Sequence, residues 1–270
     1  MQSLSRYFRV YVALARYGLA RELAFRGNFL LKLFVEVLWL AIVLAFYETI
    51  FTKTSVVATW TRTEYMFFVG CYFTLLALIE GLFLSNCSEF AELVRTGDLD
   101  FYLLKPIDEQ FLVTCRDIDW SCAGNVGMGM VVMVAALLQL QWRFHAGLAL
   151  AFAALFLCGL AIAYSLLVLL MSVSVWMKRN QSLYELWWLF SSLARYPKEI
   201  FAGRFAGPLG RFFTWVIPVL VVVNVPAGVM IRKLEDPLLV AFTVPVAGIM
   251  LVGSRWFFRF ALRRYRSASS

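Results

Sequence analysis

Hydrophobic positions along this chain gather into long blocks that short polar segments separate. Most blocks are about as long as a membrane-crossing helix, which needs about 20 residues at a rise of about 1.5 Å each. The predicted spans cover residues 28–50, 65–84, 111–140, 146–177, a fifth that begins at 182, and 238–256. The pattern therefore predicts an all-α polytopic membrane protein, with six transmembrane helices in a single domain over residues 1–270.

The first 26 residues form a basic arm in which arginines alternate with aromatic and aliphatic side chains. Arg9 and Arg16 are seven residues apart, so a helix places them on one stripe. Such a helix is typical of the headgroup layer, with its aromatic side chains in the apolar region and its arginines near lipid phosphates. We predict an interfacial amphipathic helix over residues 1–26.

Residues 85–110 make the long polar interval in the first part of the chain. Phe90, Leu93 and Val94 recur at helical spacing, and Thr96-Gly97-Asp98 is a helix stop followed by a turn. We predict a short surface helix and a docking segment that a partner contacts from the water side. The alternative is that the three apolar side chains pack on the inner helix ends of this chain. The predicted partner surface comprises Glu89, Phe90, Glu92, Leu93, Val94, Arg95, Gly97, Asp98, Leu99 and Asp100.

The pattern of a straight span is interrupted over residues 193–232. Arginine, proline and glycine residues break an aromatic-rich region there, and Pro218 and Pro226 divide the apolar run that follows. Non-helical backbone at membrane depth must be shielded by protein or line a cavity. We therefore predict a broken or re-entrant hairpin before the last span.

Charged residues inside the spans are candidates for a pathway because charge is costly in a bilayer. Lys32 and Glu36 lie four residues apart on one helix face, and Glu80 lies near the end of the second span. The alternative for the first two is a neutralising Lys32–Glu36 pair that faces protein. In the third span, Gly124 and Gly127 are predicted helix-packing positions, since small residues let another helix approach closely.

Composition places the chain in a bilayer, because 62% of its residues are hydrophobic and only 16% are charged. Arginine dominates the arm and the tail over residues 255–270, so the positive-inside rule predicts that both termini are cytoplasmic. Nucleic-acid binding is not expected, since the basic residues flank apolar spans and do not form one patch. Six basic residues run against this orientation on the predicted outer side: Arg195, Lys198, Arg204, Arg211, Arg232 and Lys233.

No catalytic constellation can be built from this sequence. His145 is the only histidine, the five cysteines have no metal-binding spacing and are expected to be reduced, and no phosphate-binding loop is present. Asp117 and Asp119 are expected to cap the third span and to pair with Arg116. We therefore predict no catalytic residues, no metal and no cofactor bound by this chain. If work is done across the membrane, another chain supplies the energy.

An interfacial arm, six spans, a polar helix after the second span and a broken hairpin together resemble the permease of type 2 ABC transporters. More narrowly, three stretches resemble a less characterised permease subfamily that is usually paired with a second permease and an ATPase. They are LVRTGDLDFYLLKPID, the RDIDW motif at 116–120, and the RYPKEIF…IPV…NVPAG series.

This resemblance implies that residues 85–110 include the coupling helix, which sits in a cleft of the ATPase. It implies two ABC ATPase subunits, which carry ATP and Mg²⁺, and a second permease, identical or homologous, in the cytoplasmic membrane of a prokaryote. The implied activity is ATP-driven export, and the few charges in the spans favour a hydrophobic or amphiphilic cargo. A membrane-embedded scaffold or assembly protein without a transport path is the alternative.

Overall fold

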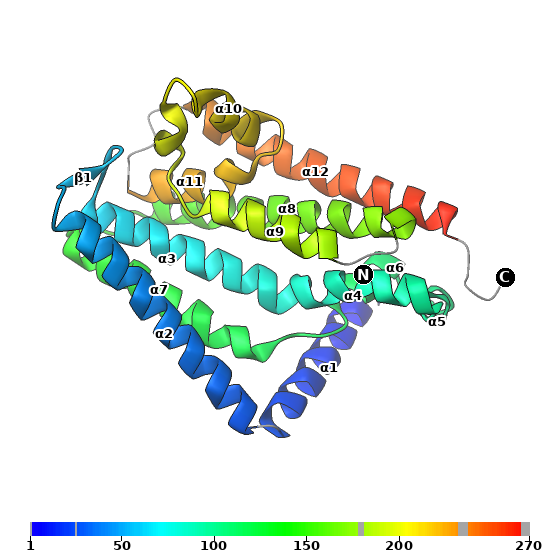
Figure 1. The fold of residues 1–270 in the computed structure, drawn as a ribbon. Helices are drawn as coiled ribbons and strands as arrows, with labels where there is room; N and C mark the ends of the chain where they lie inside the picture. The colour runs from blue at the N-terminus through cyan, green and yellow to red at the C-terminus, as the bar shows by residue number, and fades with distance from the viewer. Residues whose placement is uncertain (1, 25, 178–180, 232–236, 266–270) are drawn as a thin grey trace.

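The computed structural model describes residues 2–24, 26–177, 181–231 and 237–265. Its described residues form a bundle of long helices with one small hairpin at one end (Figure 1). The prediction of an all-α polytopic fold is confirmed. The helices are α1 (Gln2–Ala24), α2 (Arg26–Phe51), α3 (Arg62–Ile79), η1 (Glu80–Leu84), α4 (Ser85–Thr96), α5 (Leu99–Leu103), α6 (Glu109–Cys115), η2 (Trp120–Cys122), α7 (Ala123–Gln139), α8 (Ala146–Met177), α9 (Gln181–Ala194), η3 (Lys198–Ala202), α10 (Gly207–Trp215), α11 (Val219–Met230) and α12 (Pro237–Arg264). The hairpin pairs β1 (Val56–Val57) antiparallel with β2 (Trp60–Thr61).

The centre of the bundle is a single long helical rod made of α3, η1 and α4. Helix α3 packs along α7 on one side and contacts α8 and α11 on the other. In the most apolar window of this rod 67% of the residues are buried, against 11% in α2. A helix that is apolar all round belongs in the interior, and α3 meets this condition with Phe67, Phe68 and Cys71 fully buried.

Two glycines let α3 and α7 approach each other closely. A Cβ added to Gly70 would lie 2.9 Å from the Gly129 carbonyl oxygen, and one added to Gly129 would collide with Thr74. Backbone contact of this kind is how small residues support helix association without a hydrophobic driving force. The α3–α7 crossing therefore depends on both glycines.

The third predicted span is broken near its start. The sequence pattern predicted one helix over 111–140, but α6 ends at Cys115 and α7 begins at Ala123. Between them Asp119 takes an extended conformation and its side chain accepts a hydrogen bond from the Ser121 amide, which starts η2. A capping aspartate of this kind begins a new helix and does not continue the previous one.

The predicted broken region before the last span is confirmed, but its limits differ. Helix α9 has 14 residues, which at about 1.5 Å each is too short to cross about 30 Å of hydrocarbon. Helices α10 and α11 are bent by 84° around Pro218. Of the predicted region, residue 232 lies outside the described residues, as do Lys233 and Lys178-Arg179.

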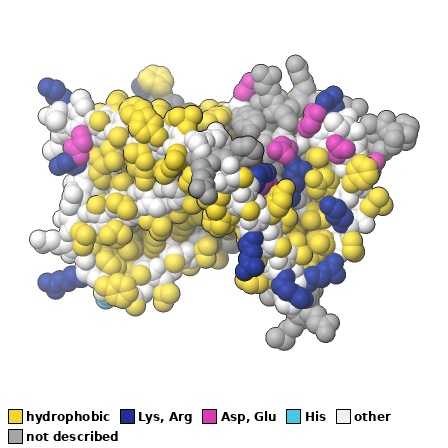
Figure 2. Space-filling model, turned by 90° about the horizontal axis from the view of Figure 1, so that it is seen from below, with side chains coloured by type: hydrophobic (Ala, Val, Ile, Leu, Met, Phe, Trp, Pro, Cys, Tyr) yellow, Lys and Arg dark blue, Asp and Glu magenta, His cyan; other side chains and the backbone are white. Residues whose placement is uncertain are grey.

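Five described helices are long and apolar enough to cross a membrane, or six if the bent α10–α11 pair counts as one span. Seen from below, side chains across the middle of the molecule are largely hydrophobic (Figure 2). Charged side chains gather mainly at the end that holds α1, α4 and α5, and a few lie at the opposite edge. The surface therefore has the belt of hydrophobic side chains that a multi-pass membrane protein requires.

Helix α1 and the last turns of α12 lie at the same end of the molecule. Arg6 of α1 donates to the Pro106 carbonyl oxygen, and Arg255 of α12 donates to Asp108. Residues 2–24 of the predicted arm form one helix, α1, which contacts the segment that follows α5. In Figure 1 α1 and α2 diverge as the two arms of a V.

Candidate functional site

Helix α4 ends in a sharp turn that brings α5 to the surface. Gly97 has φ 84°, in the left-handed region that glycine adopts without steric cost. Leu99 is fully buried and anchors α5. Its neighbours Phe101 and Leu104 are 67% and 81% exposed, an unusual position for large apolar side chains at a polar end of the protein.

The outward side of α4 is charged. Glu89, Glu92 and Arg95 are exposed, and the Arg95 Nε donates to Glu92 at 2.8 Å. A solvated pair of this type adds little stability, so these charges are available to another molecule. We call Glu89, Glu92, Arg95, Phe101 and Leu104 the α4–α5 surface.

The structure corrects the prediction that Phe90 and Val94 face a partner. Phe90 is fully buried and Val94 is 5% exposed, while the Phe90 ring packs against Phe258 of α12 with centroids 5.8 Å apart. Leu93 is half-buried against the same core. The alternative of packing within the chain holds for these side chains because α8 and α12 cover that face of α4. The prediction is also wrong for Leu99, which is fully buried. Of the other predicted surface residues, Asp98 is exposed and Asp100 is half-buried.

Arg116 connects α4 to α5. Its guanidinium donates to the Tyr102 hydroxyl at 2.9 Å and forms an ion pair with Glu89, while burial lowers its pKa. The expected Arg116–Asp117 pair is not what forms, because Asp117 pairs with Arg21 of α1 at 2.7 Å. Arg21 of the N-terminal helix therefore pairs with the carboxylate that the sequence analysis expected to pair with Arg116.

Asn86 locks the linker between α6 and η2 onto the central rod. Its side-chain amide donates to the Asp117 carbonyl at 2.7 Å and its oxygen accepts from the Asp117 amide at 3.0 Å. Nearby, the π-helical turn η1 leaves the Gly81 carbonyl oxygen free to accept the Asp119 amide at 2.9 Å. A π-helical turn of this kind is often found at functional positions, and here its free carbonyl oxygen ties the segment before η2 to the central rod.

Asp108 joins three parts of the chain at one carboxylate. It caps α6 by accepting from the Phe111 amide at 3.1 Å, and its own amide donates to the Tyr7 hydroxyl at 3.1 Å. Arg255 of α12 donates to the same carboxylate. That hydrogen bond, more than the opposing effect of burial, holds the pKa of Asp108 below its ordinary value.

The alternative in which Lys32 pairs with Glu36 is not what the structure shows, because Lys32 has other partners. Lys32 Nζ lies 3.6 Å from Asp119 and 3.9 Å from Glu22, and it donates to Ser121 at 3.5 Å. These acceptors come from α1 and the start of α7, segments that the spacing within one helix cannot predict. Lys32 therefore fixes the α1–α2 corner to η2.

Glu36 and Glu80 line one cavity of about 330 Å³. Arg195, which follows the last residue of α9, lines the same cavity, and its guanidinium lies 6.0 Å from the Trp39 ring and 5.7 Å from the Tyr72 ring, within cation–π distance. Two carboxylates and one guanidinium thus share one partly open cavity among the helices. The sequence identified Glu36 and Glu80 but missed Arg195, whose signal was its position inside an aromatic run.

The two glycines predicted to pack helices occupy different surroundings. Gly124 faces the Leu33 side chain of α2, and Gly127 faces open space. The α3–α7 crossing uses Gly129, two residues after Gly127. No described helix approaches Gly127 closely, so its predicted packing role is not met within this chain.

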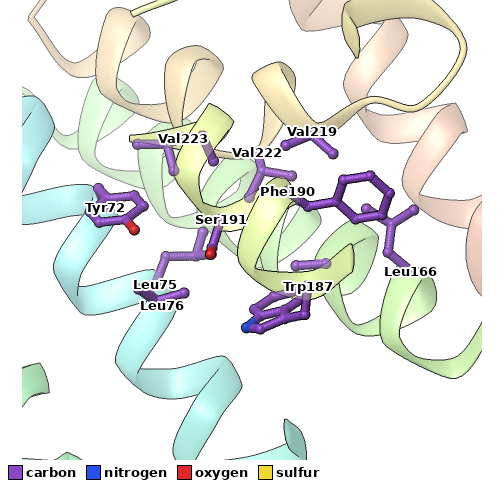
Figure 3. Close-up of a pocket in the computed structure, with 12 residues that line it drawn as sticks. Tyr72, Leu75, Leu76, Leu166, Trp187, Phe190, Ser191, Val219, Val222 and Val223 are labelled. Carbon is purple, nitrogen blue, oxygen red and sulfur yellow. The ribbon is translucent and has the colours of Figure 1, made fainter. Parts of the chain in front are cut away.

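A smaller cavity of about 30 Å³ lies where α3, α8, α9 and α11 meet (Figure 3). Trp187 and Phe190 of α9 point into it from one side and Val222 from the other. The lining is apolar, and within the described residues the Trp187 indole N–H has no hydrogen-bond partner. The side chains that line such a space lack contact atoms on one side, so less van der Waals attraction holds α9 in place.

Comparison with protein families identifies one match. The model of the ABC-2 family transporter protein matches residues 37–269, which includes the α4–α5 surface and leaves out α1 and the first part of α2. No curated protein and no solved structure matches the chain. Since the matched region covers most of its length, this chain belongs to the ABC-2 family of transporter proteins, as a transmembrane component.

Proposed function

We propose that this chain is the permease subunit of an ATP-driven exporter, and that a separate ABC ATPase drives it through the α4–α5 surface. The observation that carries the proposal is the exposure of Phe101 and Leu104 beside the charged side of α4. Exposed aromatic and aliphatic anchors inside a charged rim are typical of a protein-binding surface.

Motion at this surface has a rigid route into the membrane. Helix α4 continues α3 through η1 without a loop, so a push on α4 displaces a rod that spans the bundle. Asn86 couples the rod to the start of α7, and Asp108 couples the following segment to α12. Movement of α4 and α5 is thereby passed to α7 and α12.

The proposed assembly contains two ATPase subunits, which carry ATP and Mg²⁺, and a second permease, identical or homologous. The chain is proposed to lie in the cytoplasmic membrane of a prokaryote with both termini in the cytoplasm. The shared end of α1, α5 and α12 supports this orientation, because the ATPase must reach the same end. A hydrophobic or amphiphilic cargo is supported by the largely apolar lining of the smaller cavity.

The test is copurification of the ATPase with the full chain carrying Phe101→Ala and Leu104→Ala. Both side chains are exposed, so the variant is expected to stay folded and to lose most of its bound ATPase and ATP hydrolysis. The matched control is Phe144→Ala, because Phe144 is 78% exposed at the opposite end. Undiminished copurification in the double variant would contradict the proposal, and a chain that never binds an ATPase would favour the scaffold alternative.

A further inference from the structure

A cleft of about 670 Å³ lies between η3 and α10, in the broken region before the last span. In Figure 1 α10 lies at the end of the molecule where the hairpin is, away from α5 and the C-terminus. We call it the α10 cleft. The lining residues that matter here are Lys198, Glu199, Phe201, Arg204, Arg211 and Trp215.

The α10 cleft carries an excess of positive charge. None of Lys198, Arg204 and Arg211 forms an ion pair with a described residue. The single carboxylate in the lining, Glu199, accepts a hydrogen bond from the Trp60 indole N–H at 3.0 Å. A cleft lined by charges of one sign attracts ions of the opposite sign, so three cations around one cleft favour an anionic ligand.

The fold holds this cleft in shape. Asn224 of α11 is 2% exposed, and its oxygen accepts the Lys198 amide at 2.8 Å, while its nitrogen donates to the Leu220 carbonyl at 2.7 Å. On the other wall, a Cβ added to Gly210 would lie only 2.7 Å from the Phe201 Cβ. A buried amide and a close backbone approach thus fix η3 against α11 and α10.

Apolar side chains continue from the charged lining along α10. Phe201 of η3 and Trp215 of α10 line the cleft. Phe212 of α10 and Val216 directly after it are 43% and 65% exposed. A ligand that fits both parts has an anionic head and an apolar body. Guanidinium groups suit a phosphate head, because they donate paired hydrogen bonds to its oxygens.

We propose that the α10 cleft binds the phosphate head group of an anionic amphiphile, whose apolar part lies along α10. The binding itself stands on the cleft alone. We also assign the cleft as the place where the cargo head group leaves the permease, which rests on the proposed function. This role makes the cargo class anionic amphiphiles.

The test is native mass spectrometry of the full chain in nonionic detergent, titrated with phosphatidylglycerol or with phosphatidylcholine. The wild-type chain is expected to retain one phosphatidylglycerol saturably, and the R204Q/R211Q variant to bind it about tenfold more weakly or worse. The matched control is K53Q/R143Q, which removes two exposed cations outside the cleft. Melting temperatures of the variants establish that both remain folded.

Retention of phosphatidylglycerol by R204Q/R211Q at wild-type strength, or equal losses in both variants, would overturn the proposal. Phosphatidylcholine retained as strongly as phosphatidylglycerol would also overturn it, because the head-group charge would then not matter. Inorganic phosphate is the third titrant. If it displaced phosphatidylglycerol when both are present at the same concentration, the cleft would be a site for the free anion, and the lipid proposal would be overturned. Failure of these tests leaves ATPase copurification unaffected, so it is distinct from failure of the proposed function.

Discussion

Arg255 and Asp108, 147 residues apart in sequence, form a charge-assisted contact between the last helix and the cap of α6. The Arg255 Nη1 lies 3.2 Å from Asp108 Oδ1 and its second nitrogen donates to the other oxygen. Arg259 adds a more distant cation at 3.9 Å. Because the Asp108 amide also binds Tyr7, one residue holds the first helix, α6 and the last helix together.

Acid is expected to weaken this junction. The pKa of Asp108 is lowered, chiefly by the hydrogen bond from Arg255, so its contribution to stability is present above the pKa of the unfolded chain and is lost as the pH falls through the folded-state value. Asp108→Asn is expected to cost about 1 kcal/mol at neutral pH, since the partner is partly solvated. Thermal unfolding of the purified chain between pH 7 and pH 3 checks this. The wild type should lose more stability than the variant, and parallel curves would count against the contact.

Gly97→Ala is expected to impair coupling more than folding. A left-handed conformation costs a residue with a Cβ about 1–2 kcal/mol, so the turn between α4 and α5 should be displaced while the bundle persists. ATP hydrolysis by the purified complex is the measurement, and a decrease is expected. Gly147→Ala is the control, because its φ is not positive and its Cβ meets nothing within 4 Å. Normal hydrolysis in Gly97→Ala would remove the turn from the proposed mechanism.

Two glycines two residues apart on α7 should respond in opposite directions to alanine. Gly129→Ala places a methyl group against Thr74, and overpacking of this kind costs about 1–3 kcal/mol. Gly127→Ala has open space and gains up to about 1 kcal/mol from helix propensity. Melting temperatures of the two variants in detergent compare them directly. Equal destabilisation would show that the α3–α7 crossing is not as close as described.

Phe90 and Phe101 should separate stability from partner binding. Phe90→Ala removes a fully buried ring that packs on Phe258 and is expected to cost about 3–5 kcal/mol. Phe101→Ala removes an exposed ring and should leave the melting temperature nearly unchanged while it weakens ATPase binding. If Phe101→Ala instead destabilised the chain by as much as Phe90→Ala, the α4–α5 surface would be part of the core.

Much of the architecture follows from local sequence alone. The apolar blocks, the helix stop at Gly97 and the prolines of the broken region act over a few residues, so their consequences are visible without tertiary contacts. The same local signals indicated that Glu36 and Glu80 lie within spans.

Only the tertiary structure decided which face of each helix is covered. Helical spacing makes Phe90 and Val94 one apolar face, but that spacing is equally suited to a partner's groove and to α12 of the same chain. In the same way, Lys32 pairs with Asp119 and Asp108 pairs with Arg255 because packing brings distant segments together. Periodicity reports that a face is apolar or that a charge needs a partner, whereas the identity of the partner depends on contacts between residues far apart in the chain.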